Sequence, residues 1–144
     1  MCGGVRFEIS QAPALTLACH CRGCQRLSAS AYSLSEMIPV DGFRMLAGKP
    51  VIGALHGPSR YLYCPRCLNW LFTRPAGFDA YIMVRAMMLD EAGDYSPFIE
   101  TMTREKLPWA NTPAALSFPE FPSPDDFGDV LRAFAEHRRS PAHL

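Results

Sequence analysis

The sequence lacks a net charge, a long apolar run and a glycine-rich phosphate loop. Its 14 basic and 14 acidic residues cancel, so no summed positive field favours nucleic acid or an anionic membrane surface. No apolar run approaches the roughly 18 residues of a membrane span. Residues 1–10 lack the basic start and apolar stretch of a secretion signal. We therefore expect a cytoplasmic protein with neither a nucleic-acid nor a membrane partner.

Also missing is the alternation of strands with ten-residue helices that a parallel sheet needs. The sequence instead shows short β-strand patterns separated by turns rich in glycine and proline. These patterns cover residues 5–9, 15–19, 31–39, 43–47, 51–55, 60–63, 70–73 and 81–87. A chain of 144 residues can bury an adequate core. The pattern predicts a mainly β fold.

The C-terminal part of the sequence differs from the rest. After Leu107, five prolines favour an extended arm laid over the sheets (Pro108, Pro113, Pro119, Pro122 and Pro124). A helix is predicted from Pro124 to about Arg138, capped by Ser123 and Asp126. Its apolar face, formed by Phe127, Val130, Leu131 and Phe134, should pack on its own domain, the alternative being a partner-binding or dimer role. We expect one domain over 1–122 and a helical extension over 123–144.

The six cysteines favour metal binding over disulfides, because they are clustered and no secretion signal accompanies them. Cys19 and Cys21 are two residues apart, so in an extended chain both face one side and His20 faces the other. Cys24 adds a C-x-x-C spacing typical of zinc, and Gly23 eases the turn. Three thiolates leave a tetrahedral ion with an open position, which is typical of catalytic zinc.

A second C-x-x-C pair is Cys64 and Cys67, to which we assign Cys2 as a third ligand. A fourth ligand is missing, because a C-x-C pair ending at Cys2 would need a cysteine before Met1. Redox dithiols are an alternative, although the βαβ context typical of them is absent. A cysteine nucleophile paired with His20 is another, although neighbours in an extended chain point apart. His56 is interpreted as a surface or loop histidine.

The order of the motifs resembles a known family. Cys-Gly-Gly-Val-Arg-Phe is followed by Cys-His-Cys-x-x-Cys, by Arg-Tyr-Leu-Tyr-Cys-x-x-Cys and by Pro-Trp. This order is similar to that of the glutathione-dependent formaldehyde-activating enzyme family, which includes the vertebrate centromere protein CENP-V. The resemblance runs from Cys2 to about Pro122, and the terminal helix lies outside it.

The resemblance implies several coiled antiparallel sheets around two zinc sites. By position, Cys19, Cys21 and Cys24 match the ligands of the open, catalytic zinc. Cys2, Cys64 and Cys67 match three of the four ligands of the structural zinc. The first cysteine of the family's C-x-C-G motif is absent here, so either the start codon lies upstream or the site is incomplete. Leu68 replaces the glycine that usually follows the second C-x-x-C, so that turn must be held differently.

The resemblance also implies a function. We expect a zinc-dependent carbon–sulfur lyase or synthase, in which a zinc-bound glutathione thiolate adds to formaldehyde or a related aldehyde to give an adduct such as S-hydroxymethylglutathione. One or two zinc ions per chain are the expected cofactors, and glutathione is the cosubstrate. The alternatives are a non-catalytic zinc-stabilised binding module or glutathione carrier, and a thiol redox or metal sensor.

Overall fold

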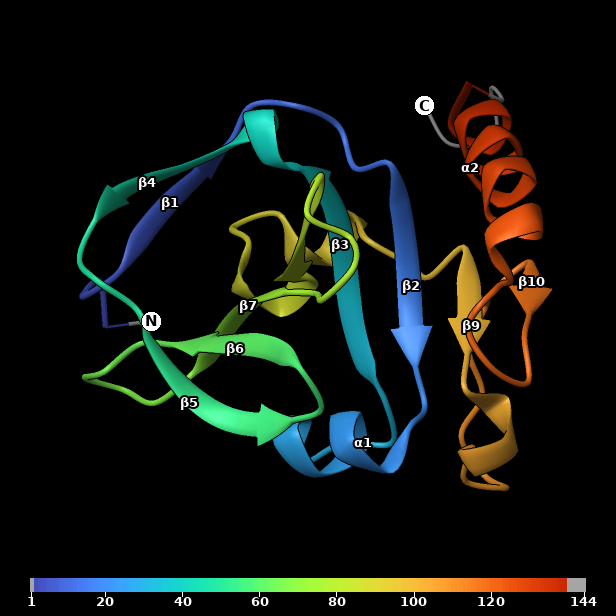
Figure 1. The fold of residues 1–144 in the computed structure, drawn as a ribbon, viewed down its shortest axis with the longest axis horizontal. Coiled ribbons are helices and arrows are strands. Elements are labelled where there is room, and N and C mark those ends of the chain that lie inside the picture. Colours follow the sequence, from blue (N-terminus) through green and yellow to red (C-terminus); the bar gives the residue numbers. More distant parts are fainter. Residues whose placement is uncertain (1, 140–144) are drawn as a thin grey trace.

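The computed structural model describes residues 2–139, which form ten strands, two α-helices and four 3-10 helices (Figure 1). The strands are β1 (Arg6–Ile9), β2 (Leu15–Cys19), β3 (Ser33–Pro39), β4 (Phe43–Ala47), β5 (Val51–His56), β6 (Ser59–Tyr63), β7 (Trp70–Arg74), β8 (Tyr81–Arg85), β9 (Ile99–Thr101) and β10 (Leu116–Ser117). The helices are α1 (Arg22–Ser28) and α2 (Pro124–Arg139), and the 3-10 helices are η1 (Val40–Gly42), η2 (Ala86–Met88), η3 (Ala92–Asp94) and η4 (Thr103–Glu105).

Eight strands form one sheet in the order β10-β9-β2-β3-β8-β7-β6-β5, and β1 pairs with β4 in a separate two-stranded sheet. The pairing is antiparallel except where β9 lies parallel to β2 and β10 lies parallel to β9. The predicted mainly β fold with one C-terminal helix is confirmed. The parallel pairs were not anticipated. The chain reaches β9 through the η2 and η3 segment and reaches β10 through η4 and the following arm, so no long crossover helix connects the parallel strands.

The two faces of the large sheet carry separate cores, as the strand alternation requires. On one face, Leu15, Leu17 and Met37 join Phe98, Ile99 and two residues of α2 in the first cluster. On the other face, a second cluster joins Ile38, Cys64, Leu71, Phe72, Ile82 and Val84. The β1–β4 pair covers this second cluster, and Phe7 and Phe43 stack with ring centroids 5.2 Å apart. Each face of the sheet is therefore covered by a different element.

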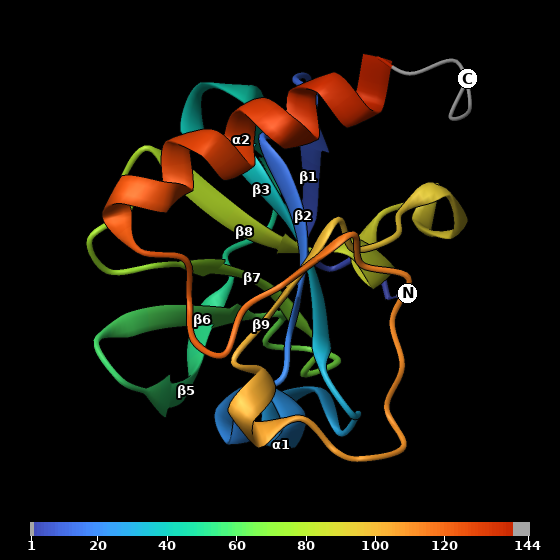
Figure 2. The ribbon, with the colours of Figure 1, turned by 90° about the vertical axis from the view of Figure 1, so that its right-hand side faces the viewer.

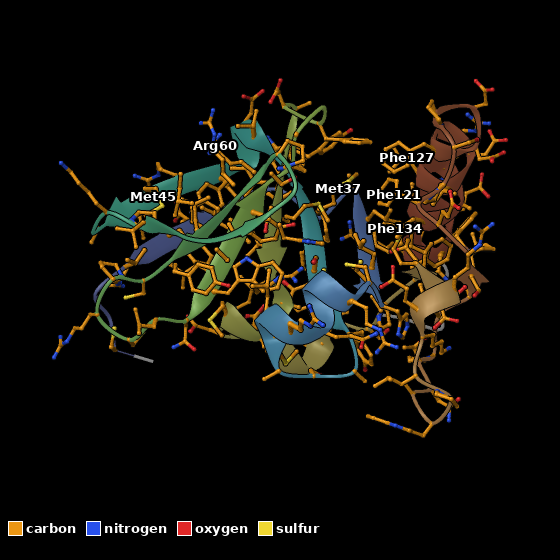
Figure 3. The ribbon with its side chains drawn as sticks, turned by 60° about the horizontal axis from the view of Figure 1, so that its bottom comes forward. Met37, Met45, Arg60, Phe121, Phe127 and Phe134 are labelled. Carbon is orange, nitrogen blue, oxygen red and sulfur yellow. The ribbon has the colours of Figure 1, made fainter. Side chains whose placement is uncertain are left out.

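The C-terminal helix α2 begins where the sequence predicts. Ser123 caps it, because its Oγ accepts a hydrogen bond from the Asp126 backbone N–H at 3.2 Å and donates to the Asp126 carboxylate. Val130 and Phe134 are buried in the first core cluster. Figure 2 shows α2 lying across the sheet, and in Figure 3 Phe127 and Phe134 lie on the side of the helix that faces Met37. The helix therefore packs on its own chain, and residues 140–144 of the expected extension lie outside the described residues.

Three local predictions differ from the structure. A helix, α1, replaces the simple turn expected around Gly23. Strand β8 ends at Arg85, because residues 86–88 turn into η2. The arm predicted after Leu107 contributes a short strand, β10, because the Ala115 and Leu116 N–H groups both donate to the Phe98 carbonyl. Within residues 2–139, no helix is both long and apolar enough to cross a membrane.

Candidate metal centres

The sulfurs of Cys19, Cys21 and Cys24 lie within 4.8 Å of one another, and we call these residues the Cys19 group. Cys19 ends β2, and Cys21 is the N-cap of α1, where its Sγ accepts a hydrogen bond from the Cys24 backbone N–H at 3.3 Å. The first turn of a helix thus brings Cys24 back towards Cys21. Sequence analysis predicted the three partners but not the helix, since cysteine here fills the role that serine or threonine usually has.

A second segment of the chain clamps the loop that carries the Cys19 group. Gln25 Nε2 donates to the His20 carbonyl at 2.6 Å and to the Glu105 carbonyl at 2.9 Å. The Glu105 carboxylate accepts from the Arg22 backbone N–H at 2.7 Å. In Figure 2, η4 lies beside α1, as these contacts require. The spacing of 83 residues between Arg22 and Glu105 gives no sequence signal for this clamp.

His20 points away from the three sulfurs, as predicted from strand alternation. Its ring is fully buried, and Nε2 lies 3.2 Å from Glu100 Oε2. Glu100 also accepts hydrogen bonds from Lys106, Thr112 and Ser117. Burial opposes ionisation of Glu100, but these hydrogen bonds outweigh it and lower its pKa to about 2. His20 and Glu100 therefore join β2 to β9 and the arm, and His20 is not a member of the Cys19 group.

His56 comes close to the Cys19 group, which sequence analysis did not predict. Its Nε2 lies 3.6 Å from Cys21 Sγ. The ring also occupies the space beside Gly23, where an added Cβ would lie 2.1 Å from Nε2. His56 is nonetheless not one of the residues whose ligand atoms all lie within 4.8 Å of one another. It borders the group on one side, in the exposed hairpin between β5 and β6.

The protonation of the Cys19 group is uneven. Hydrogen bonds from Cys19, and then from Cys24, lower the pKa of the Cys21 thiol. The pKa values of Cys19 and Cys24 are raised, chiefly because each thiol shares its proton with a neighbouring sulfur and because burial disfavours further charge. One thiolate therefore forms readily, and the next ones require a cation. A soft divalent ion such as zinc fits this set of donors.

The second cysteine group consists of Cys2, Cys64 and Cys67, and we call it the Cys64 group. Cys2 and Cys64 sulfurs are 3.6 Å apart, and Asn69 Nδ2 donates to Cys67 Sγ at 3.2 Å. Hydrogen bonds from the Asn69 backbone and side chain lower the pKa of Cys67 to about 6. The group contacts the second core cluster, on the side of the sheet covered by β1 and β4. Three thiols fit a zinc ion, and among residues 2–139 no fourth His, Cys, Asp or Glu joins them.

The turn of the Cys64 group contains Leu68 at the glycine position. Leu68 has φ of +58°, in the left-handed region that favours glycine, and its N–H donates to the Cys64 carbonyl at 2.9 Å. We expected that turn to be held differently, and the structure gives it the backbone conformation that favours glycine. Leu68 itself adopts the left-handed conformation, with its side chain 72% exposed.

A cavity of about 810 Å³ lies away from both cysteine groups. Its lining comes mostly from β1, from the segment that follows it, from the η3 region and from α2, with single residues of β2, β3 and β4. None of the six cysteines lines it.

Two comparisons with known proteins give matches. The family model described as glutathione-dependent formaldehyde-activating enzyme matches residues 1–105. A solved crystal structure of a Rhodobacter sphaeroides protein, a structural genomics target, is similar with 17% identity and a TM-score of 0.53. The match covers 62% of this chain and 84% of that one, and at this identity it supports the fold alone. A search of curated proteins finds no match.

Proposed function

Because the chain belongs to the glutathione-dependent formaldehyde-activating enzyme family, we propose that it forms or breaks the carbon–sulfur bond between glutathione and formaldehyde. The Cys19 group would be the reaction site, with zinc as its cofactor. The observation that carries the proposal is the grouping of three sulfurs from one short segment within 4.8 Å, with no fourth His, Cys, Asp or Glu from residues 2–139. A zinc ion bound by these three sulfurs would have one position left for a substrate.

The charge of the site suits a sulfur substrate. Three thiolates around a divalent ion carry a net charge of −1, so the site is a milder Lewis acid than one built from histidines. A zinc ion there would supply the positive charge that favours the ionised form of a thiol, whose free pKa is about 8.5. The clamp formed by Gln25 and Glu105 keeps the three cysteines in place. The chain therefore contributes three sulfur ligands that are held in place and whose negative charge a divalent ion would partly neutralise.

The reaction is an addition that needs no oxidant or reductant. The sulfur of the thiolate attacks the carbonyl carbon of formaldehyde, and a carbon–sulfur bond forms. The π electrons of the carbonyl move to its oxygen, which takes up the proton released from the thiol. The product is S-hydroxymethylglutathione, and the lyase reaction is the same set of steps run in reverse. Glutathione and an aldehyde would thus be the small-molecule partners.

A glutathione carrier would use the same three ligands, so binding alone does not identify a catalyst. The test is the exchange rate between formaldehyde and S-hydroxymethylglutathione, measured by NMR with ¹³C-labelled formaldehyde. Zinc-loaded protein should accelerate exchange above the rate of free glutathione, and Cys21→Ser should abolish the acceleration. Binding of glutathione without any acceleration would identify a carrier and contradict the proposal.

A further inference from the structure

Arg85, the last residue of β8, is a buried cation with unused hydrogen-bond donors. The residue is 7% exposed, and its Nε and Nη1 atoms have no hydrogen-bond partner within the described part of the chain. None of the ion pairs among residues 2–139 includes it. Buried guanidinium groups almost always have acceptors or an opposite charge beside them. A buried arginine in this condition indicates that these two donors serve an acceptor other than the described side chains.

The strand register places Arg85 on the face of the sheet that carries the Cys19 group. Cys19 lies opposite Ser33 in β3, and Ser35 lies opposite Arg85 in β8. Residues two apart in a strand share a face, so Cys19, Ser33, Ser35 and Arg85 all point to the same side. Arg85 is therefore separated from Cys19 by a single strand, β3, on the same face of the sheet.

A row of ring side chains connects Arg85 with the Cys19 group. The Arg85 guanidinium lies over the Trp70 ring, 4.1 Å from its centroid. Trp70 contacts Tyr61 with ring centroids 5.4 Å apart, and Tyr61 contacts His56 at 6.1 Å. His56 in turn borders Cys21. The Trp70 N–H is occupied by Thr73, so the row offers Arg85 a π face but no anion.

The neighbouring acidic residue does not neutralise Arg85. Glu36 of β3 lies opposite Val84, so its side chain points to the other face of the sheet. Burial raises the pKa of Glu36 to about 8, and its two carboxyl oxygens have no hydrogen-bond partner among the residues that the structure describes. Near neutral pH the closest carboxyl in the adjacent strand is therefore mostly uncharged. The positive charge of Arg85 remains available to the Cys19 group.

We propose that Arg85 is the specificity-determining residue of the Cys19 group, where its charge selects an anionic thiolate over a neutral fourth ligand. This inference rests on the proposed function. Three thiolates and a divalent ion already carry −1, and a fourth thiolate makes the centre −2. Inside a protein, a positive charge nearby stabilises the more negative state, whereas a neutral ligand such as imidazole leaves the charge unchanged. Arg85 is thus a positioning charge and does not itself react.

The test uses the cobalt-substituted protein, whose visible spectrum reports the fourth ligand directly, without an activity assay. It is titrated with glutathione, with 2-mercaptoethanol and with imidazole. Arg85→Gln should lower the affinity for both thiols by about tenfold or more, while the affinity for imidazole changes less than about twofold. The matched control is Arg60→Gln in β6, which removes an exposed positive charge from the same sheet. This control should change neither affinity.

The outcomes separate this inference from the proposed function. Equal losses of thiol and imidazole affinity in Arg85→Gln, or no loss of either, would overturn the role of Arg85. If Arg85→Gln does not fold, Arg85→Lys becomes the test of the role of Arg85, because lysine keeps the positive charge. Its ratio of thiol to imidazole affinity should then stay within about threefold of wild type, and a larger fall would overturn a role based on charge. Arg85-dependent binding of 2-mercaptoethanol without any binding of glutathione would refute the glutathione function and support this inference.

Discussion

At the scale of single residues, Leu68 is the clearest case of a residue in a conformation that it disfavours. Its φ of +58° places the Cβ in a crowded region, at a cost of roughly 1–2 kcal/mol relative to glycine. Its side chain is exposed and gains little from packing. We predict that Leu68→Gly raises the free energy of unfolding by about 1 kcal/mol, measured by urea denaturation of the zinc-loaded protein. Leu68→Ala, which keeps the Cβ, should give no such gain.

Glu36 gives a second prediction at this scale, from its pKa of about 8 in the folded state against 4.5 in the ordinary case. Between these values the unfolded chain has lost the proton that the folded protein still holds, so stability falls as pH rises. Glu36→Gln has no such proton. Its stability relative to wild type should therefore increase from about pH 5 to about pH 8, by up to about 1.4 kcal/mol per pH unit.

Urea denaturation at several pH values measures this difference. Glu136→Gln is the control, since it removes a carboxyl from an exposed position of α2. A difference between Glu36→Gln and wild type that stays constant across this pH range would show that the Glu36 carboxyl is charged inside the fold.

At the scale of elements, the sequence predicts those structures that a short pattern determines. Helix α2 was identified because capping residues and an apolar face coincide within one segment. Strands β2 and β4 were identified with the bounds that the structure has. Helix α1 was missed because its cap is a cysteine, read as a ligand only. Strand β9 was missed because three residues give no pattern, and its position depends on the contact between Glu100 and His20.

The packing of α2 on the sheet gives a prediction for this scale. Phe134 is 4% exposed and contacts Phe98 with ring centroids 5.3 Å apart. Phe134→Ala should lower the free energy of unfolding by roughly 3–5 kcal/mol, because it removes buried apolar surface and leaves a cavity. Phe121→Ala, at a position that is 39% exposed, is the matched control and should cost much less. A loss for Phe134→Ala as small as that expected for Phe121→Ala would mean that burial of Phe134 does not hold α2 on the sheet.

The packing of α2 also bears on the predicted division of the chain into 1–122 and 123–144, which stays a prediction. Since the family match ends at residue 105, the helix lies outside the matched region. Val130 and Phe134 nevertheless share a core cluster with Leu15 and Met37. A protein ending at Pro122 should therefore fold less stably than the full chain, as monitored by thermal denaturation.

At the scale of the whole molecule, the two cysteine groups lie on different faces of the sheet and have different consequences. The Cys64 group joins the N-terminal segment to the turn after β6 and contacts the second core cluster. A structural zinc contributes roughly 10–16 kcal/mol, as much as the stability of an entire domain. Cys67→Ser should therefore unfold the protein. Cys21→Ser should leave it folded, because the Cys19 group joins residues of one short segment. Equal melting temperatures would contradict this division.

The sequence predicted both cysteine groups but not their surroundings. The spacing of Cys19, Cys21 and Cys24 is local, so it could be interpreted without a fold. The positions of His56 and Arg85 follow from how β5 and β8 enter the sheet, and no spacing along the chain encodes that order. Residues that reach a site from distant strands can therefore be identified only from the three-dimensional structure, even where the ligands can be identified from the sequence.

The central claim is that the Cys19 group holds a zinc ion with a position open to glutathione. Native mass spectrometry of protein purified without chelators tests it directly, with wild type and Cys21→Ser measured side by side. Wild type should carry one zinc ion more than Cys21→Ser and should bind one glutathione per chain, whereas the folded variant should bind none. Equal zinc content in the two proteins, or glutathione bound by both, would contradict the account.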